Sequence, residues 1–353
     1  MTNSTHRLQV ATRRARLAGA VVACLLAGAL ISACNSSGNN VPNTSGGAAT
    51  STTSSSSSSS TANGTWSSAT SLDMGNSLES VSCASAMYCV AVDGISAGAT
   101  AGNALTYSGT SWSAPVAVGA VGSLVSVSCP TTSFCAAVDN GGNAFTYSGS
   151  AWTKFATVAA DQFAAVACAS SSFCIAGVNN GRASTWDGSA WSKPAKVTSN
   201  GEGITAASCP SASFCVATDG SGAYTFNGSA WSAEQALGSG TSGPVGVSCS
   251  SASFCVAVGA DGSVYTYNGT SWTTGAKIDV VNGTSLGLGG VSCPSVSFCM
   301  AFEGGGNWFQ TFNGHTWSSP AMADPGIVFD SLSCPSASFC MGIDPNHVLT
   351  WHS

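Results

Sequence analysis

The chain has 353 residues, of which only 7% are charged and 42 are glycine. All fifteen acidic residues but only five of the nine basic ones follow residue 34, so this part of the chain has a net charge of −10. That sign disfavours attraction to nucleic-acid phosphates and to acidic lipid headgroups, and we expect no nucleic-acid partner. Leu, Glu and Lys do not alternate at helical spacing, which excludes long amphipathic helices.

Residues 1–33 have the pattern of an export signal. Four arginines lie between residues 7 and 16, and residues 17–33 form an uncharged run at the short limit for crossing a bilayer. The run ends in Ile31-Ser32-Ala33-Cys34, which resembles the lipobox of bacterial lipoproteins. The alternatives are a plain secretory signal and an uncleaved anchor helix. Thr12-Arg13-Arg14 is compatible with twin-arginine export, but Arg16 stands where that signal prefers an apolar residue, so the export route stays open.

The lipobox resemblance implies cleavage before Cys34, whose thiol then receives a diacylglycerol and whose amine is usually acylated, with palmitate as the expected acid. Residues 34–62 are then the lipidated cysteine followed by a linker that contains no aromatic or charged residue. Such a segment cannot bury enough surface to fold, and as a coil it reaches on the order of 30 Å. We expect a lipid anchor on the outer face of the bacterial membrane or envelope, with the linker as a tether.

Fourteen further cysteines form seven pairs, each with five residues between its members, and the first cysteines recur every 39 to 46 residues. The pairs are Cys83/Cys89, Cys129/Cys135, Cys168/Cys174, Cys209/Cys215, Cys249/Cys255, Cys293/Cys299 and Cys334/Cys340. A chain exported past the membrane reaches an oxidising compartment, in which such pairs are expected to form disulfides. Each disulfide should stabilise the fold by roughly 2–3 kcal/mol in the chain-entropy model. Zinc is the alternative, but it would need two pairs to converge, and no histidines lie near successive pairs.

Each unit continues from its cysteines into an aromatic strand, a turn such as Asn268-Gly269 and then a tryptophan. A period near forty residues with several short strands is typical of a β-propeller blade. We predict an all-β, seven-bladed propeller of four-stranded blades over residues 63–353. Strand a should end at the first cysteine, strand b begin at the second, strand c carry the aromatic pair, and strand d begin at the tryptophan.

The ends of the domain predict how the ring closes. The chain stops just after strand c of the last unit, and residues 63–66 supply the missing turn and strand d. This closure resembles that of WD-repeat and other seven-bladed propellers, although the WD-repeat dipeptides are absent. The phrase Tyr267–Trp272 is similar to the Asp-box of sialidase-type propellers, but its Asn lies one residue nearer the Gly.

Loop lengths vary on only one predicted face. The a–b and c–d turns share a face and have constant spacing, whereas the b–c segments span 11 to 18 residues and the d–a segments 16 to 21. Varied loops on a constant scaffold favour binding there, although unconstrained loops also drift in length. On this face the fourth residue after the second cysteine is acidic in five units: Asp93, Asp139, Asp219, Glu303 and Asp344. They could hold a cation or basic ligand, but capping of their own turns is the favoured interpretation.

Units six and seven depart most from the repeat, and their distinctive residues are our candidate binding site. These are Glu303, Trp308, Asp330, Asp344 and His347. A tryptophan beside carboxylates and a histidine could bind a sugar or small molecule, but decay of the repeat at its end explains them slightly better.

Catalysis has little support in the residues. His315, His347 and His352 stand in no recognised nucleophile or metal motif, and Arg182 is the only arginine after the signal. We therefore predict a monomeric, non-catalytic binding module with no metal or cofactor, recognising glycan, peptide or envelope protein through the variable face. The alternative is a structural scaffold of an envelope complex without a small ligand.

The lipobox yields a direct test. Mass spectrometry of the mature N-terminus should find the chain beginning at Cys34 with the added mass of diacylglycerol and an acyl chain. An unmodified peptide beginning elsewhere would refute this prediction.

Overall fold

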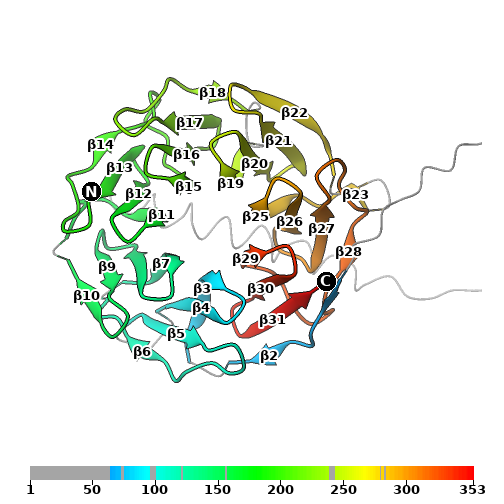
Figure 1. The fold of residues 1–353 in the computed structure, drawn as a ribbon, viewed down its shortest axis with the longest axis horizontal. Coiled ribbons are helices and arrows are strands. Elements are labelled where there is room, and N and C mark those ends of the chain that lie inside the picture. The colour runs from blue at the N-terminus through cyan, green and yellow to red at the C-terminus, as the bar shows by residue number, and fades with distance from the viewer. Residues whose placement is uncertain are drawn as a thin grey trace, which may run out of the picture. The chain divides into compact units, whose positions relative to one another are not determined.

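The computed structural model describes residues 64–72, 75–95, 101–120, 122–155, 157–237, 243–278, 280–281 and 284–353. They belong to one compact unit, Ser59–Ser353, whose sheets are arranged as the blades of a ring (Figure 1). Within these ranges no residue is helical, so none contributes a helix that could cross a bilayer. The predicted all-β, seven-bladed propeller is confirmed, whereas the predicted signal, Cys34 and the linker lie outside the described residues.

The strands nearest the centre are strands a, and each pairs with a strand b. Strands a of blades 1 to 7 are β3 (Ser77–Ser85), β7 (Leu124–Thr131), β11 (Phe163–Ser170), β15 (Ala206–Ser211), β19 (Pro244–Ser251), β25 (Leu288–Ser295) and β29 (Ser331–Ser336). Strands b are β4 (Tyr88–Gly94), β8 (Phe134–Asp139), β12 (Phe173–Val178), β16 (Phe214–Thr218), β20 (Phe254–Gly259), β26 (Phe298–Glu303) and β30 (Phe339–Ile343).

Strands c and d complete the blades toward the rim. Strands c are β5 (Asn103–Tyr107), β9 (Ala144–Tyr147), β13 (Arg182–Trp186), β17 (Gly222–Phe226), β21 (Ser263–Tyr267), β27 (Trp308–Phe312) and β31 (His347–His352). Strands d of blades 1 to 6 are β6 (Val116–Ala117), β10 (Trp152–Lys154), β14 (Ala195–Lys196), β18 (Gln235–Ala236), β22 (Trp272–Lys277) and β28 (Ala321–Met322). In blade 7 this place is taken by β1 (Thr65–Trp66) and β2 (Thr70–Ser71).

The predicted strand boundaries at the cysteines are wrong in every blade. Each strand a continues for two residues beyond its first cysteine, and each strand b begins one residue before its second cysteine, at a tyrosine or phenylalanine. The a–b turn is therefore shorter than the spacing of the cysteines suggested, because residues on both sides of it continue the ladder. The second cysteines consequently lie inside strand b, where all are fully buried: Cys89, Cys135, Cys174, Cys215, Cys255, Cys299 and Cys340.

All seven predicted disulfides are present, and the Cα atoms of each pair lie 3.9–4.2 Å apart. They are Cys83–Cys89, Cys129–Cys135, Cys168–Cys174, Cys209–Cys215, Cys249–Cys255, Cys293–Cys299 and Cys334–Cys340. In blade 1 Cys83 lies directly opposite Cys89 within the β3–β4 ladder. The cysteines therefore join two paired strands and do not mark the ends of a loop.

The predicted start of strand d is correct in only two of the first six blades. β10 and β22 begin at their tryptophans, but in the other four blades the tryptophan makes an isolated bridge and strand d begins four residues later. In these four a serine follows the tryptophan, and its Oγ accepts the strand c amide, as Ser113 does from Thr106 at 3.1 Å. The hydroxyl thus takes a hydrogen bond that a strand d carbonyl would otherwise accept, which interrupts the ladder.

The N-terminal strand closes the ring, as predicted. β1 pairs with β31 so that Trp66 lies opposite Trp351, and β2 pairs with the other end of the same strand. Trp351 is fully buried. Its partner Trp66 contacts Phe309 of blade 6, with the ring centroids 5.8 Å apart. The first described residues thus fill the place that a tryptophan-bearing strand d fills in the other blades.

Neighbouring blades are joined near the centre by a hydrogen bond that recurs at six of the seven interfaces. The serine immediately before the first cysteine of a blade accepts the backbone N–H of the first cysteine of the next blade, at 2.9–3.0 Å. The pairs are Ser82/Cys129, Ser128/Cys168, Ser208/Cys249, Ser248/Cys293, Ser292/Cys334 and Ser333/Cys83. The last pair joins blade 7 to blade 1, so closure uses the same bond as five of the other interfaces.

The interface between blades 3 and 4 differs from the other six. Ala167 stands where the serine would be and offers no hydroxyl to Cys209. Packing continues across this interface, because Ala167 and Ile175 belong to one apolar cluster with Cys209 and Cys215. The interface therefore keeps its apolar contacts and lacks the polar bond.

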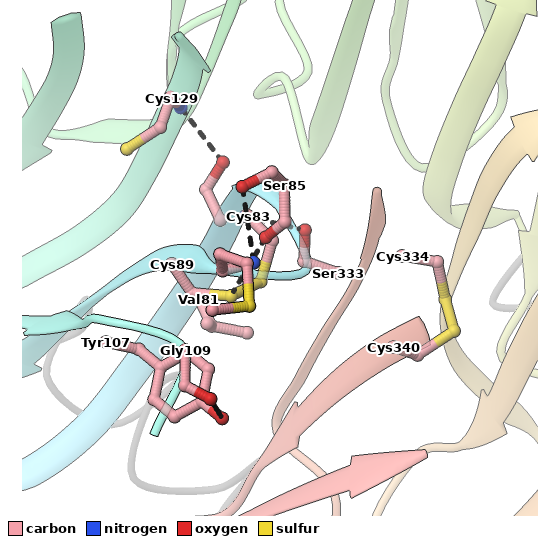
Figure 2. The surroundings of a disulfide bond; sticks show 12 residues. Val81, Cys83, Ser85, Cys89, Tyr107, Gly109, Cys129, Ser333, Cys334 and Cys340 are labelled. Atoms are coloured by element: carbon pink, nitrogen blue, oxygen red, sulfur yellow. Dashed lines mark hydrogen bonds between the residues drawn. A yellow bond between two sulfur atoms is a disulfide. The ribbon is translucent and has the colours of Figure 1, made fainter. Parts of the chain in front are cut away.

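The disulfides lie between the blades as well as within them. Cys83 and Cys89 pack against Met341 of blade 7, and Cys334 and Cys340 pack against Met300 of blade 6. Figure 2 shows the first disulfide with Ser333 of blade 7 and Cys129 of blade 2 near it. Each of these sulfur pairs therefore serves as apolar packing material against the preceding blade, in addition to linking its own strands.

Ring closure gives a stability prediction. Deleting residues 63–75 removes β1, β2 and the Trp66 packing, and should lower the free energy of unfolding by about 3 kcal/mol or more while exposing an edge of β31 that promotes aggregation. Deleting residues 35–62 is the control and should leave unfolding unchanged. Thermal unfolding and light scattering of both truncations test this. A 63–75 deletion as stable and monomeric as the parent would contradict the closed ring.

The irregular interface gives a second prediction. Ala167→Ser should supply the missing acceptor to Cys209 and raise the free energy of unfolding by about 1 kcal/mol, whereas Ser82→Ala should lower it by about the same amount. Denaturant unfolding with the disulfides intact measures both changes. A folded Ala167→Ser variant with no gain would show that the serines do not stabilise the interfaces.

Candidate functional site

The two faces of the ring differ in how tightly their turns are built. In the c–d turns of the first six blades a glycine adopts φ between 86° and 97°, a conformation that other residues rarely adopt. In blades 2 to 6 a Cβ on this glycine would lie 3.2–3.5 Å from a serine Cα in the a–b turn of the same blade. The two tight turns therefore lie against each other on one face, as predicted, and this close approach explains their constant lengths.

The opposite face carries the b–c and d–a segments, and we call it the loop face. Its longest d–a segment, between blades 5 and 6, contains an additional hairpin of β23 (Val280–Val281) and β24 (Thr284–Ser285). Ser285 ties this hairpin to blade 5, because its Oγ donates to the carbonyl of Asp261 at 2.7 Å. The loop face therefore accommodates inserted structure that the opposite face does not have room for.

Four of the five repeated carboxylates cap their own b–c turns. Asp139 is fully buried and accepts the backbone N–H groups of Gly141 and Asn143 at 2.9 and 2.8 Å. Asp93, Asp219 and Asp344 are also buried and accept backbone N–H groups of their turns. The capping interpretation is confirmed for these four, and their carboxylates do not form an open ring of ligands.

Glu303 is the exception among the five. It is half-buried, burial raises the pKa of its carboxyl, and the backbone N–H of Trp308 donates to it. The two residues flank the Gly304–Gly306 turn of blade 6. These two candidate residues therefore lie close together, and the carboxylate of Glu303 accepts a hydrogen bond from the backbone of Trp308.

The other candidates lie in blade 7 and the segment that enters it. The Nδ1 atom of His347 lies 2.9 Å from Oδ2 of Asp344, whose side chain is almost entirely buried. The backbone N–H of Asp330 donates to the carbonyl of Ile343. The structure therefore brings four of the five candidates together as two pairs, Glu303 with Trp308 and Asp344 with His347, each within its own turn. Asp330 belongs to neither pair.

Asp324 is a residue of this region that sequence reasoning missed. Its Oδ1 accepts the N–H of Gly326, and its Oδ2 accepts the N–H of Ala69 from the N-terminal segment at 3.1 Å. The hydrogen bond from Gly326, then that from Ala69, and the nearby His347 lower the pKa of the half-buried Asp324 carboxyl. The Asp324-Pro325-Gly326 sequence signalled a turn, but its partner at residue 69 depends on ring closure.

Blade 4 contains a second polar group that the sequence did not indicate. The hydroxyl of Tyr224 lies 2.9 Å from Asp219 Oδ2 and 3.1 Å from Glu234 Oε2. Burial, followed by the adjacent carboxylates, raises the pKa of this tyrosine. Ser221 also contacts both acids. These hydrogen bonds link strand c of blade 4 to the adjacent loops. Because Tyr224 and Asp219 are buried, the network offers little surface to a ligand.

The described residues show no cluster for binding a metal ion. Among them, no group of three or more His, Cys, Asp or Glu side chains is placed to hold a metal ion. All ten tryptophans are described, and none of them is fully exposed.

Comparison with known proteins gives the fold and no family. No protein-family model matches the sequence, and no curated protein matches it. Among solved structures, "YCF48 bound to D1 peptide" superposes with a TM-score of 0.61 at 12% identity, covering 81% of this chain and 96% of that one. "Crystal structure of RRP9 WD40 repeats" gives 0.63 at 9% identity, covering 78% and 94%. "Structure of U3-55K" gives 0.61 at 9% identity, covering 79% and 96%. At 9–12% identity these likenesses show that the chain shares the propeller fold.

Proposed function

We propose that this propeller is a non-catalytic protein- or peptide-binding module, held at the cell envelope by a lipid on Cys34 and binding through its loop face. The observation that carries the proposal is the contrast between the faces. One face is locked by turns that lie against each other, whereas the other varies in length and carries the β23–β24 hairpin. Binding residues generally lie on variable loops positioned by a rigid scaffold.

A protein or peptide ligand is favoured over a glycan. A sugar ring binds best against an open aromatic face, and each tryptophan here is at least partly buried. Six of them lie against the aromatic residue of strand c, with ring centroids 5.3–5.8 Å apart in pairs such as Tyr107 and Trp112. One structurally similar propeller is described as bound to a peptide, which supports the same class of ligand for this chain.

The scaffold alternative would require a broad apolar side surface. The exposed large apolar residues are five in the described part of the chain: Met87, Val116, Val296, Met322 and Val328. They lie in blades 1 and 6 and in the segment that enters blade 7, so the described rim of blades 2 to 5 has no such side chain. A ligand-binding module is therefore the better supported of the two functions.

The proposal is tested with two matched triple variants of the mature chain. Asn140→Arg, Asn179→Arg and Asn346→Arg place three charges on exposed b–c turns, whereas Thr132→Arg, Ala212→Arg and Ala252→Arg place three on exposed a–b turns. In a binding screen against envelope proteins and glycans, the first variant should bind its protein ligand at least about tenfold more weakly, a loss of about 1.4 kcal/mol, and the second should bind like the parent.

Thermal unfolding confirms that both variants are folded. Loss of binding in the a–b variant alone would place the ligand on the opposite face. Binding of glycans and no protein would overturn the choice of ligand.

A further inference from the structure

The rim of the ring has a groove between blades 6 and 7. Its volume is about 410 Å³, and it is lined by residues 319–323 around β28 on one side, by Gly64–Trp66 on the other, and by Phe309 beneath. This volume lies in the range of pockets that bind small groups or side chains. The groove is lined mainly by apolar groups and lies between the outermost strands of two blades, β28 of blade 6 and β1 of blade 7.

Ring closure creates this groove and fixes its ends. Trp66 stands edge-on to Phe309 at an interplanar angle of 82°, so the N-terminal strand supplies an aromatic wall. Beyond Ala323, the hydrogen bond from Ala69 N–H to Asp324 Oδ2 joins the two walls. Gly64 and Thr65 line the other end. The groove is therefore bounded by an ionised carboxylate at one end and by the start of the described chain at the other.

One wall has the features of a strand that accepts another strand. β28 is outermost in its sheet, so its backbone pairs with β27 on one side only. Met322 is 51% exposed, and Val328 nearby in the chain is 44% exposed. Exposed sheet edges bind extended peptides through main-chain hydrogen bonds, while pockets beside them select side chains.

The charge around the groove selects among peptides. Residues 64–153 and 280–353, which build blades 6, 7 and 1 and most of blade 2, contain no Lys or Arg. Blades 6 and 7 contain Glu303, Asp324, Asp330 and Asp344, and Asp324 stands at the end of the groove. A basic side chain would meet a favourable potential here, and an acidic one would be repelled.

We propose that this groove binds an extended segment of a partner protein in which a large apolar side chain is flanked by Lys or Arg. The apolar side chain enters the groove above Phe309, the cation faces Asp324, and the segment lies along the free edge of β28. The chain's own residues 35–62 do not have this composition, because they include no aromatic residue, Lys or Arg. The site goes beyond the proposed loop-face function and is tested separately from it.

The probes are two fluorescein-labelled peptides, Ser-Gly-Lys-Leu-Phe-Lys-Val-Ser-Gly and the same peptide with both lysines replaced by glutamate. Fluorescence anisotropy with the mature chain should show the lysine peptide binding at least about tenfold more tightly, and raised salt should reduce the difference. Equal binding of the two peptides, or no binding of either, would overturn the proposal.

Variants locate the site. Ala321→Phe should fill the groove and abolish binding, whereas Ala195→Phe, at the same register position in blade 3, should bind like the parent. Thr65 is exposed on the N-terminal wall of the groove, so Thr65→Arg adds a positive charge there without filling the groove. It should weaken binding of the lysine peptide even if Ala321→Phe misfolds. Asp324→Asn keeps an acceptor for Ala69 and should weaken the lysine peptide several-fold.

A loop-face variant with Asn140→Arg and Asn179→Arg but without Asn346→Arg distinguishes this site from the proposed function, because these two turns belong to blades 2 and 3. It should bind the lysine peptide like the parent, whatever its effect on the loop-face ligand. Loss of the peptide in that variant or in Ala195→Phe, with binding retained in Thr65→Arg, would place the peptide elsewhere and refute the groove.

Discussion

The hydrogen bond from the first cysteine of one blade to the preceding blade's serine is the interaction on which the ring depends. The donor and acceptor are adjacent residues of the same strand, so five of the seven inner strands donate to one neighbour and accept from the other. The disulfide holds that strand to its own blade, and its sulfurs pack against the blade before. Three residues, Val-Ser-Cys in most units, thus link the repeat within and between blades. Each blade has few charged residues and few large apolar side chains, so the disulfide and the serine hydrogen bond supply stabilisation that those side chains do not.

The outer parts of the blades follow from this inner ring. Five aromatic pairs join strand b of one blade to strand c of the next, with centroids 5.3–6.4 Å apart: Phe134/Trp186, Phe173/Phe226, Phe214/Tyr267, Phe254/Phe312 and Phe298/Trp351. Turns that lie against each other fix one face of the ring. The repeats therefore differ from one another mainly on the opposite face and at the closure groove. Both proposed binding surfaces lie where the repeat is interrupted, one by loop length and one by the meeting of the chain's ends.

Much of this architecture could be predicted from the sequence, because period, cysteine spacing and turn dipeptides are local signals repeated seven times. The incomplete last unit also revealed closure by Trp66. The serine bond could not be predicted, because Ser82 and Cys129 are 47 residues apart and serine is common throughout the chain. The groove and the Asp324–Ala69 contact could not be predicted either, because they bring together the two ends of the domain; Ala69 and Asp324 are 255 positions apart. The carboxylates were placed correctly on one face, but only their hydrogen bonds showed that four of them cap turns and leave no open cation site.

The most direct test of the account is hydrogen exchange at the seven first-cysteine amides, measured by NMR on the disulfide-intact mature chain. Six should be strongly protected, and Cys83 should exchange as slowly as Cys129, although its acceptor, Ser333, lies 250 residues away. Cys209, which faces Ala167, should exchange faster than the other six. Rapid exchange at Cys83 with slow exchange at the other five serine-bonded amides would show an open array and contradict the closed ring.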